Sequence, residues 1–174
     1  MRQQSRAYWV AAIATVGIAF AIVSPARSER PPTDPIKAFK RFVGTWTVTP
    51  SSPELDSSGT LTIAAVAHEQ ALHSVFTSPE KVGRSPLEEH RLWAYDWGRN
   101  EVLVLEASST GGALHFKGKL AASGDVVLEA AGAEDYILEQ SISWKSATEV
   151  QVRTLIKRGS KIEQTRLVAW KKNR

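Results

Sequence analysis

Cysteine is absent from the 174-residue chain, and neither sign of charge dominates it. The lack of cysteine excludes disulfide scaffolds, thiol nucleophiles and cysteine-ligated zinc or iron–sulfur sites. The 22 basic and 18 acidic residues leave a net charge of only +4, which is too balanced to indicate nucleic acid as a partner. The composition is otherwise that of a folded domain, with 43% hydrophobic residues and no low-complexity tract.

Motifs that carry chemistry are also scarce. The sequence contains no nucleophile elbow, phosphate-binding loop or dinucleotide fingerprint. Two adjacent carboxylate pairs, Glu88-Glu89 and Glu134-Asp135, fall in predicted loops, where neighbouring side chains diverge and nothing nearby supplies a complementary acid or base. We therefore expect that the chain is not an enzyme and has no catalytic residues.

The four histidines do not form a metal site in the sequence pattern. The segment from His68 to His73 resembles the zinc signature His-Glu-any-any-His, but on a helix or a strand its longer spacing sends the two imidazoles in different directions. His115 alternates to the solvent side of its strand, and His90 lies at the end of a long loop. We expect no metal and no cofactor, and heme binding by a single histidine is kept as a second alternative.

The first 26 residues have the order of a secretory signal peptide. Arg2 and Arg6 precede an apolar run over residues 10–23, and Ser24 and Ala26 place small residues where a signal peptidase reads them. A retained anchor is the alternative, although the 16 residues 8–23 fall short of the about 20 that a span needs. We predict cleavage after Ala26, a linker over residues 27–35, a periplasmic or secreted location, and no membrane contact after cleavage.

A short helix is predicted directly after the linker. Asp34 can cap free backbone N–H groups, and Pro35 suits the first helical position. The spacing of Phe39 and Phe42 in the following residues 36–43 predicts an amphipathic helix of about two turns.

Beyond residue 43 the hydrophobic period changes from 3.6 to 2, which is typical of half-buried strands. About ten strands are predicted, over residues 44–49, 61–65, 72–77, 90–96, 102–107, 114–120, 126–130, 136–144, 150–157 and 162–171. Hairpin-length turns join nearly all of them, and no helical stretch long enough for a parallel crossover separates any two. We predict an all-β, antiparallel up-and-down barrel of about 8–10 strands over residues 36–172, with the helix closing one end.

Three segments carry a family resemblance. Phe42-Val43-Gly44-Thr45-Trp46 resembles the Gly-any-Trp opening of lipocalins and related barrels. Together with Trp93-Ala94-Tyr95-Asp96 and Val168-Ala169-Trp170-Lys171-Lys172, it makes the chain similar to a bacterial family of secreted lipocalin-like (calycin-type) domains without an assigned function, distantly related to fatty-acid-binding and nitrobindin-type barrels. The glycine-rich continuation of nitrobindin-type heme barrels is missing.

The resemblance implies that Trp46 lies across the closed end and packs against a basic residue of the last strand. Arg166, Lys171 and Lys172 are the candidates for that residue.

The function predicted from these patterns is non-catalytic binding of a small apolar or amphipathic molecule inside the barrel. Small residues predicted to face inward, namely Gly44, Ala65, Ala94 and Gly118, leave space, and few charges are predicted inside. Trp97 is predicted to share the strand face of Trp93 and Tyr95. The candidate ligand-lining residues are Trp46, Val48, Leu61, Ile63, Phe76, Trp93, Tyr95, Leu114, Phe116, Leu128 and Leu138.

The alternative function is a structural or interaction barrel whose interior is filled by side chains. The one long connection, residues 78–89, is the predicted lid over the ligand and, in the alternative, the segment that docks a protein partner.

Overall fold

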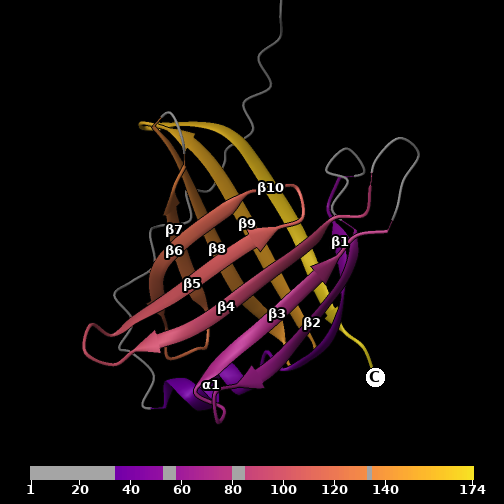
Figure 1. The fold of residues 1–174 in the computed structure, drawn as a ribbon, viewed down its shortest axis with the longest axis vertical. Coiled ribbons are helices and arrows are strands. Elements are labelled where there is room, and N and C mark those ends of the chain that lie inside the picture. The colour runs from indigo at the N-terminus through magenta and orange to yellow at the C-terminus, as the bar shows by residue number, and fades with distance from the viewer. Residues whose placement is uncertain (1–33, 53–57, 80–84, 133–134) are drawn as a thin grey trace, which may run out of the picture.

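The computed structural model describes residues 34–52, 58–79, 85–132 and 135–174, so the predicted signal peptide and most of the predicted linker lie outside the described residues. Within them the chain forms one helix and ten strands (Figure 1). In chain order these are α1 (Pro35–Lys40), β1 (Gly44–Pro50), β2 (Gly59–Val66), β3 (Ala71–Thr77), β4 (Glu88–Asp96), β5 (Glu101–Ser108), β6 (Ala113–Leu120), β7 (Val126–Ala131), β8 (Tyr136–Ser146), β9 (Glu149–Arg158) and β10 (Lys161–Lys172).

The start of α1 is the one predicted. The Asp34 carboxylate accepts a hydrogen bond of 2.9 Å from the backbone N–H of Lys37, and Pro35 occupies the first turn, where its missing N–H costs nothing. The helix ends at Lys40, earlier than predicted, and the chain continues as a turn in which Phe42 N–H donates to the Phe39 carbonyl at 2.9 Å. In the described part of the chain, no helix has the length and apolarity to cross a membrane.

The ten strands close into an antiparallel barrel in which every strand pairs with its neighbours in the sequence. The first and last strands complete the ring, with Trp46 opposite Lys172 and Val48 opposite Trp170. Each other pair joins two strands that are consecutive in the sequence. The predicted up-and-down barrel is therefore confirmed.

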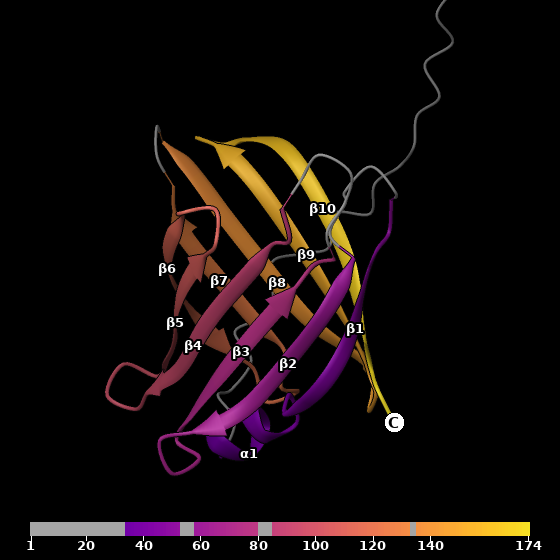
Figure 2. The same ribbon diagram turned by 45° about the vertical axis from the view of Figure 1, so that its right-hand side comes forward.

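The two ends of the barrel differ. One end, called the helix end here, is covered by α1, as Figures 1 and 2 both show. There the Phe39 ring lies 6.3 Å from Tyr95 of β4, and the Phe42 ring lies 4.8 Å from Trp144 of β8. The opposite end, called the distal end, is where β1 ends at Pro50 and β10 begins at Lys161. The helix therefore closes one end, as predicted.

Alternation along each strand separates an inner from an outer face, and β7 shows it without exception, with buried and exposed residues in turn. Every candidate ligand-lining residue from the sequence is buried or is partly buried against the core. The fully buried side chains of largest volume include Trp46, Phe116, Leu128 and Ile142.

Three predictions about the barrel interior are wrong. Trp97 lies in the turn after β4, where the strand geometry no longer holds, and it is 61% exposed. Ala94 lies between the buried residues Trp93 and Tyr95 and so belongs to the outer face. Gly118 does not create space either, because a Cβ built there would meet the Val127 carbonyl oxygen of β7 at 1.8 Å. At this position the neighbouring backbone fills the room that the missing side chain leaves.

Candidate ligand-binding cavity

A cavity of about 160 Å³ lies inside the barrel, from mid-height towards the distal end. Aliphatic and aromatic side chains of six strands form one part of its wall, and polar side chains of five strands form the rest. The apolar lining consists of Val48, Leu61, Phe76, Trp93, Val152, Val168 and Trp170, and the polar lining of Ser74, Glu89, Arg91, Gln140, Thr154 and Arg166.

Four of the predicted ligand-lining residues border this cavity, namely Val48, Leu61, Phe76 and Trp93. The other seven belong to the packed interior rather than to the cavity wall. They are Trp46, Ile63, Tyr95, Leu114, Phe116, Leu128 and Leu138. The pattern therefore identified inward positions correctly, but it did not distinguish the filled part of the barrel from the part that holds space.

Four polar side chains form a bridge across the barrel interior. They are Glu89, Arg91, Glu106 and Gln140, called the Arg91 cluster here. Arg91 of β4 places Nη2 2.9 Å from Glu89 and 2.6 Å from Glu106 of β5. Its Nη1 donates at 3.0 Å to the side-chain carbonyl of Gln140, which belongs to β8 on the opposite wall. The prediction that few charges lie inside the barrel is wrong where the Arg91 cluster crosses the interior.

The ion pair between Arg91 and Glu106 is deeply placed, with their side chains only 13% and 11% exposed. Arg91 Nε and Glu106 Oε2 are nevertheless buried without hydrogen-bond partners among the described residues. Burial raises the pKa of the Glu106 carboxyl above its ordinary value, and the nearby Glu89 acts in the same direction. Arg91 opposes this shift but does not cancel it. Glu106 is thus a carboxyl that is costly to ionise.

Neutral polar groups complete the cavity wall. The Trp93 indole N–H donates to the Ser74 hydroxyl at 3.0 Å, which satisfies a buried donor next to the cavity. The Gln140 amide N–H donates to the Thr154 hydroxyl at 3.3 Å, so this side chain links the Arg91 cluster to β9. These contacts fix the rotamers of the wall before any ligand arrives.

The polar lining was missed although the same alternation contains it. Arg91 and Glu89 precede Trp93 by two and four residues and therefore share its inner face of β4. Gln140 lies on the inner face of β8, between Leu138 and Ile142. Charged residues usually face water, so the residue types at these positions predict exposure although their spacing predicts burial. Continued alternation was the signal that could have found them.

Trp46 fills the helix end of the interior and takes no part in the cavity. It is fully buried, and its indole N–H donates at 2.8 Å to the Phe42 carbonyl, which ties β1 to the segment after α1. The Lys172 ammonium lies 5.2 Å from the centre of the Trp46 ring. Of the three basic candidates, Lys172 is therefore the one that packs against Trp46, whereas Arg166 borders the cavity.

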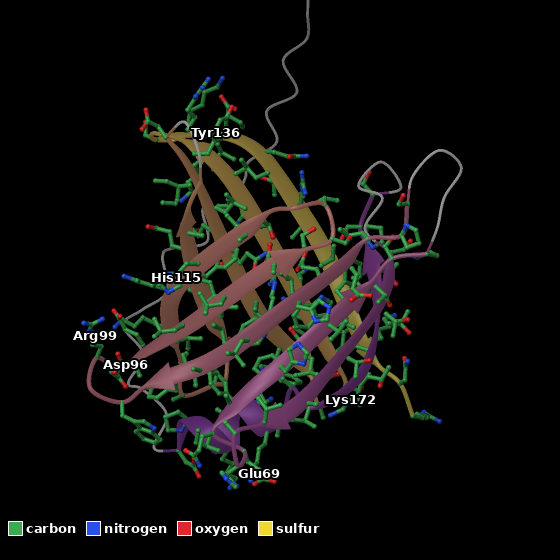
Figure 3. All side chains as sticks on the ribbon, viewed as in Figure 1. Glu69, Asp96, Arg99, His115, Tyr136 and Lys172 are labelled. Atoms are coloured by element: carbon green, nitrogen blue, oxygen red, sulfur yellow. The ribbon has the colours of Figure 1, made fainter. Side chains whose placement is uncertain are left out.

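The histidines lie outside the barrel interior. His73 alternates with the buried residues Leu72 and Ser74, so it faces outward, and Figure 3 shows His115 on the outer surface. His73 Nε2 lies 3.2 Å from His90 Nδ1, and His90 Nε2 lies 2.6 Å from a Glu88 carboxylate oxygen. No histidine belongs to the cavity lining in the described part of the chain, so this wall offers no imidazole to a heme iron.

The long connection between β3 and β4 is described only at its two ends. Ser78 N–H donates to the Leu87 carbonyl at 2.9 Å, which holds the base of the loop together. Residues 80–84 lie outside the described residues, so the predicted roles of the 78–89 loop as a lid and as a protein-docking segment stay predictions.

Comparison with known proteins supports the fold and little more. No protein-family model matches the chain, and no curated protein is similar to it in sequence. The S-type phycobiliprotein lyase CPES from Guillardia theta is similar in structure, with a TM-score of 0.53 and 12% identity over 79% of this chain and 92% of that one. A de novo designed fluorescence-activating β-barrel gives a TM-score of 0.30 and 14% identity over 78% of this chain and 97% of that one.

The chain is thus a ten-stranded antiparallel barrel with a lipocalin-like fold. The likeness also corrects a prediction. The expectation that the chain is not an enzyme is contradicted, because a protein with this fold is a lyase. The absence of familiar catalytic motifs is therefore no ground for excluding catalysis in a barrel of this kind.

Proposed function

We propose that the chain is an exported protein that binds a small amphipathic molecule in the cavity of its barrel. The observation that carries this proposal is the cavity itself, which one group of apolar and one group of polar side chains line. A concave, mostly apolar site with a few fixed polar groups is the usual form of a small-molecule site.

The size of the cavity limits the ligand. Its volume of about 160 Å³ is below the ~300–1,000 Å³ of typical ligand sites. It is close to the ~150 Å³ of an apolar protein cavity that takes up benzene. The part of the ligand that enters the barrel is therefore about as large as one six-membered ring or a short alkyl chain.

The lining supports an amphipathic ligand rather than a purely apolar one. Phe76, Trp93 and Trp170 provide aromatic surface, whereas Glu89, Arg91 and Arg166 bring charge to the same wall. A hydrocarbon would leave these polar groups facing an apolar surface, which is unfavourable unless they keep their own partners.

Binding is tested by titrating the purified protein with one-ring and medium-chain apolar compounds and following tryptophan emission. We expect saturable changes with dissociation constants between about 1 µM and 1 mM, which correspond to roughly 8 and 4 kcal/mol. Val168→Phe, which fills the cavity, should abolish the response. The matched control Val127→Phe adds the same ring on the exposed outer face of β7 and should bind like the wild type.

The binding proposal fails if no compound of the panel saturates the wild-type protein, or if Val168→Phe binds as well as the wild type. The barrel with a filled interior, the alternative function, would then be the better account. Far-UV circular dichroism of both variants shows whether the fold is kept.

Export is proposed from the order of residues 1–26 alone. Mass spectrometry of the mature protein from its native cell envelope should show an N-terminus at Arg27. Intact Met1 in a membrane pellet would replace the signal peptide with a retained anchor.

A further inference from the structure

We propose that the ligand carries a neutral oxygen that accepts a hydrogen bond, on a body about the size of one ring, and that the indole N–H of Trp170 binds this oxygen. The inference rests on the proposed binding function and names the chemical class of the ligand. It starts from the tryptophans, which differ in how their N–H groups are used.

Three of the described tryptophans have satisfied N–H groups. Trp46 donates to the Phe42 carbonyl, Trp93 to the Ser74 hydroxyl, and Trp144 to the Gly124 carbonyl at 3.1 Å. Trp97 is exposed and can donate to water. Trp170 is different, because it is only 7% exposed, borders the cavity, and has no acceptor for its N–H among the described residues. The N–H is not among the described atoms that are buried without a partner, so it reaches accessible space, and a ligand in the adjacent cavity can accept its hydrogen bond.

Two hydroxyls on the same wall also have a hydrogen left to donate. Ser74 accepts from Trp93, and Thr154 accepts from Gln140, but in the described structure neither hydroxyl donates to another group. A hydroxyl has one hydrogen and two lone pairs, so accepting leaves the donor unused. The neutral part of the cavity wall therefore offers donors, and a complementary ligand supplies an acceptor.

The charges of the wall favour a neutral acceptor over a carboxylate. Arg91 already faces two carboxylates, those of Glu89 and Glu106, and Glu89 itself borders the cavity. An anionic ligand would be repelled by Glu89 and would have to compete for Arg91. Arg166 borders the cavity from an exposed position and donates to Gln164, so its charge is screened by water.

The test compares three one-ring compounds of similar size, namely acetophenone, ethylbenzene and benzoate. Acetophenone differs from ethylbenzene by the carbonyl oxygen, and benzoate adds a negative charge. We expect acetophenone to bind the wild-type protein roughly fivefold more tightly than ethylbenzene, as one net hydrogen bond provides. Benzoate should bind more weakly than acetophenone.

Trp170→Phe keeps an aromatic ring and removes the N–H. In this variant both compounds lose the contact area that the larger indole provides, but the preference for acetophenone over ethylbenzene should disappear. Trp97→Phe is the matched control and should keep the preference, because Trp97 lies outside the barrel interior. In the wild type, the Trp170 indole N–H resonance should shift further on adding acetophenone than on adding ethylbenzene, whose ring contributes only its ring current, and this tests the contact even if the variant does not fold.

The possible results separate this inference from the proposed function. Saturable binding without preference for acetophenone overturns the inference and leaves the binding function standing. If benzoate binds more tightly than acetophenone, the ligand's acceptor is not neutral. If Trp170→Phe still prefers acetophenone over ethylbenzene, Trp170 does not bind the oxygen. If none of the three compounds, and none of the wider panel, binds, the proposed function itself is wrong.

Discussion

The helix end of the barrel interior is packed with large apolar side chains, whereas the distal part holds ion pairs, hydrogen-bonded amides and a cavity. At the helix end, Trp46 contacts the ring of Trp144, with the two ring centroids 5.9 Å apart. At the distal level, Arg91 crosses the interior to Gln140. Both regions follow the same strand alternation, so the residue types at inward positions, and not the backbone pattern, decide which end is filled.

This difference indicates that the two ends of the barrel have different roles, one in stability and one in binding. The filled end buries large apolar side chains such as Trp46, which stabilises the fold. The distal end keeps polar groups away from bulk water, which weakens the fold unless those groups are paired. Such a departure from an apolar core is typical of a functional site.

The largest effect is expected at the helix end. Trp46→Ala should lower the free energy of unfolding by about 3–5 kcal/mol, because it empties a fully buried aromatic site and removes the hydrogen bond to Phe42. The measurement is urea unfolding followed by circular dichroism. Trp97→Ala is the matched control and should change stability by less than about 0.5 kcal/mol. A loss below roughly 1 kcal/mol for Trp46→Ala would show that the helix end does not carry the stability of the barrel.

A smaller effect is expected from the Arg91 cluster. Arg91→Met keeps most of the side-chain volume but leaves Glu89 and Glu106 facing each other without a counter-charge. We expect the free energy of unfolding to fall by about 3 kcal/mol at neutral pH. This is the lower end of the range for breaking a buried ion pair, because Glu106 can take up a proton. The Arg99 side chain is 70% exposed, so the control Arg99→Met should leave the free energy of unfolding almost unchanged. Equal stabilities of the two variants would mean that the cluster is effectively in water.

The smallest effect is a change in pH dependence. Because the pKa of Glu106 is higher in the folded chain than its ordinary 4.5, the folded chain retains this proton while the unfolded chain releases it. The contribution of Glu106 to stability is therefore complete below pH 4.5 and is lost as the pH rises through the raised pKa.

Glu106→Gln removes this dependence. The stability of the wild type relative to the variant should fall as the pH rises above 4.5 in urea unfolding curves. Glu129→Gln, on the exposed face of β7, should keep the wild-type slope. A wild-type stability that rises relative to Glu106→Gln over this range would contradict the burial of the Glu106 carboxyl.

Much of the fold was predictable because it depends on local signals. Asp34 and Pro35 define the helix start, and alternation with short turns defines the strands and their meander. The cavity was less predictable, since it depends on which inward side chains meet across the barrel. Arg91 reaches Gln140 over 49 residues of sequence, and the backbone of β7 fills the room beside Gly118. Neither contact has a local sequence signal.

The central claim, that the distal part binds and the helix end only packs, is tested most directly by the indole N–H resonances in a ¹⁵N-labelled sample titrated with the one-ring panel. The account predicts saturable shifts of Trp93 and Trp170, which border the cavity, and nearly constant positions for Trp46 and Trp144. Shifts that are equal at both ends, or confined to Trp46 and Trp144, would contradict it.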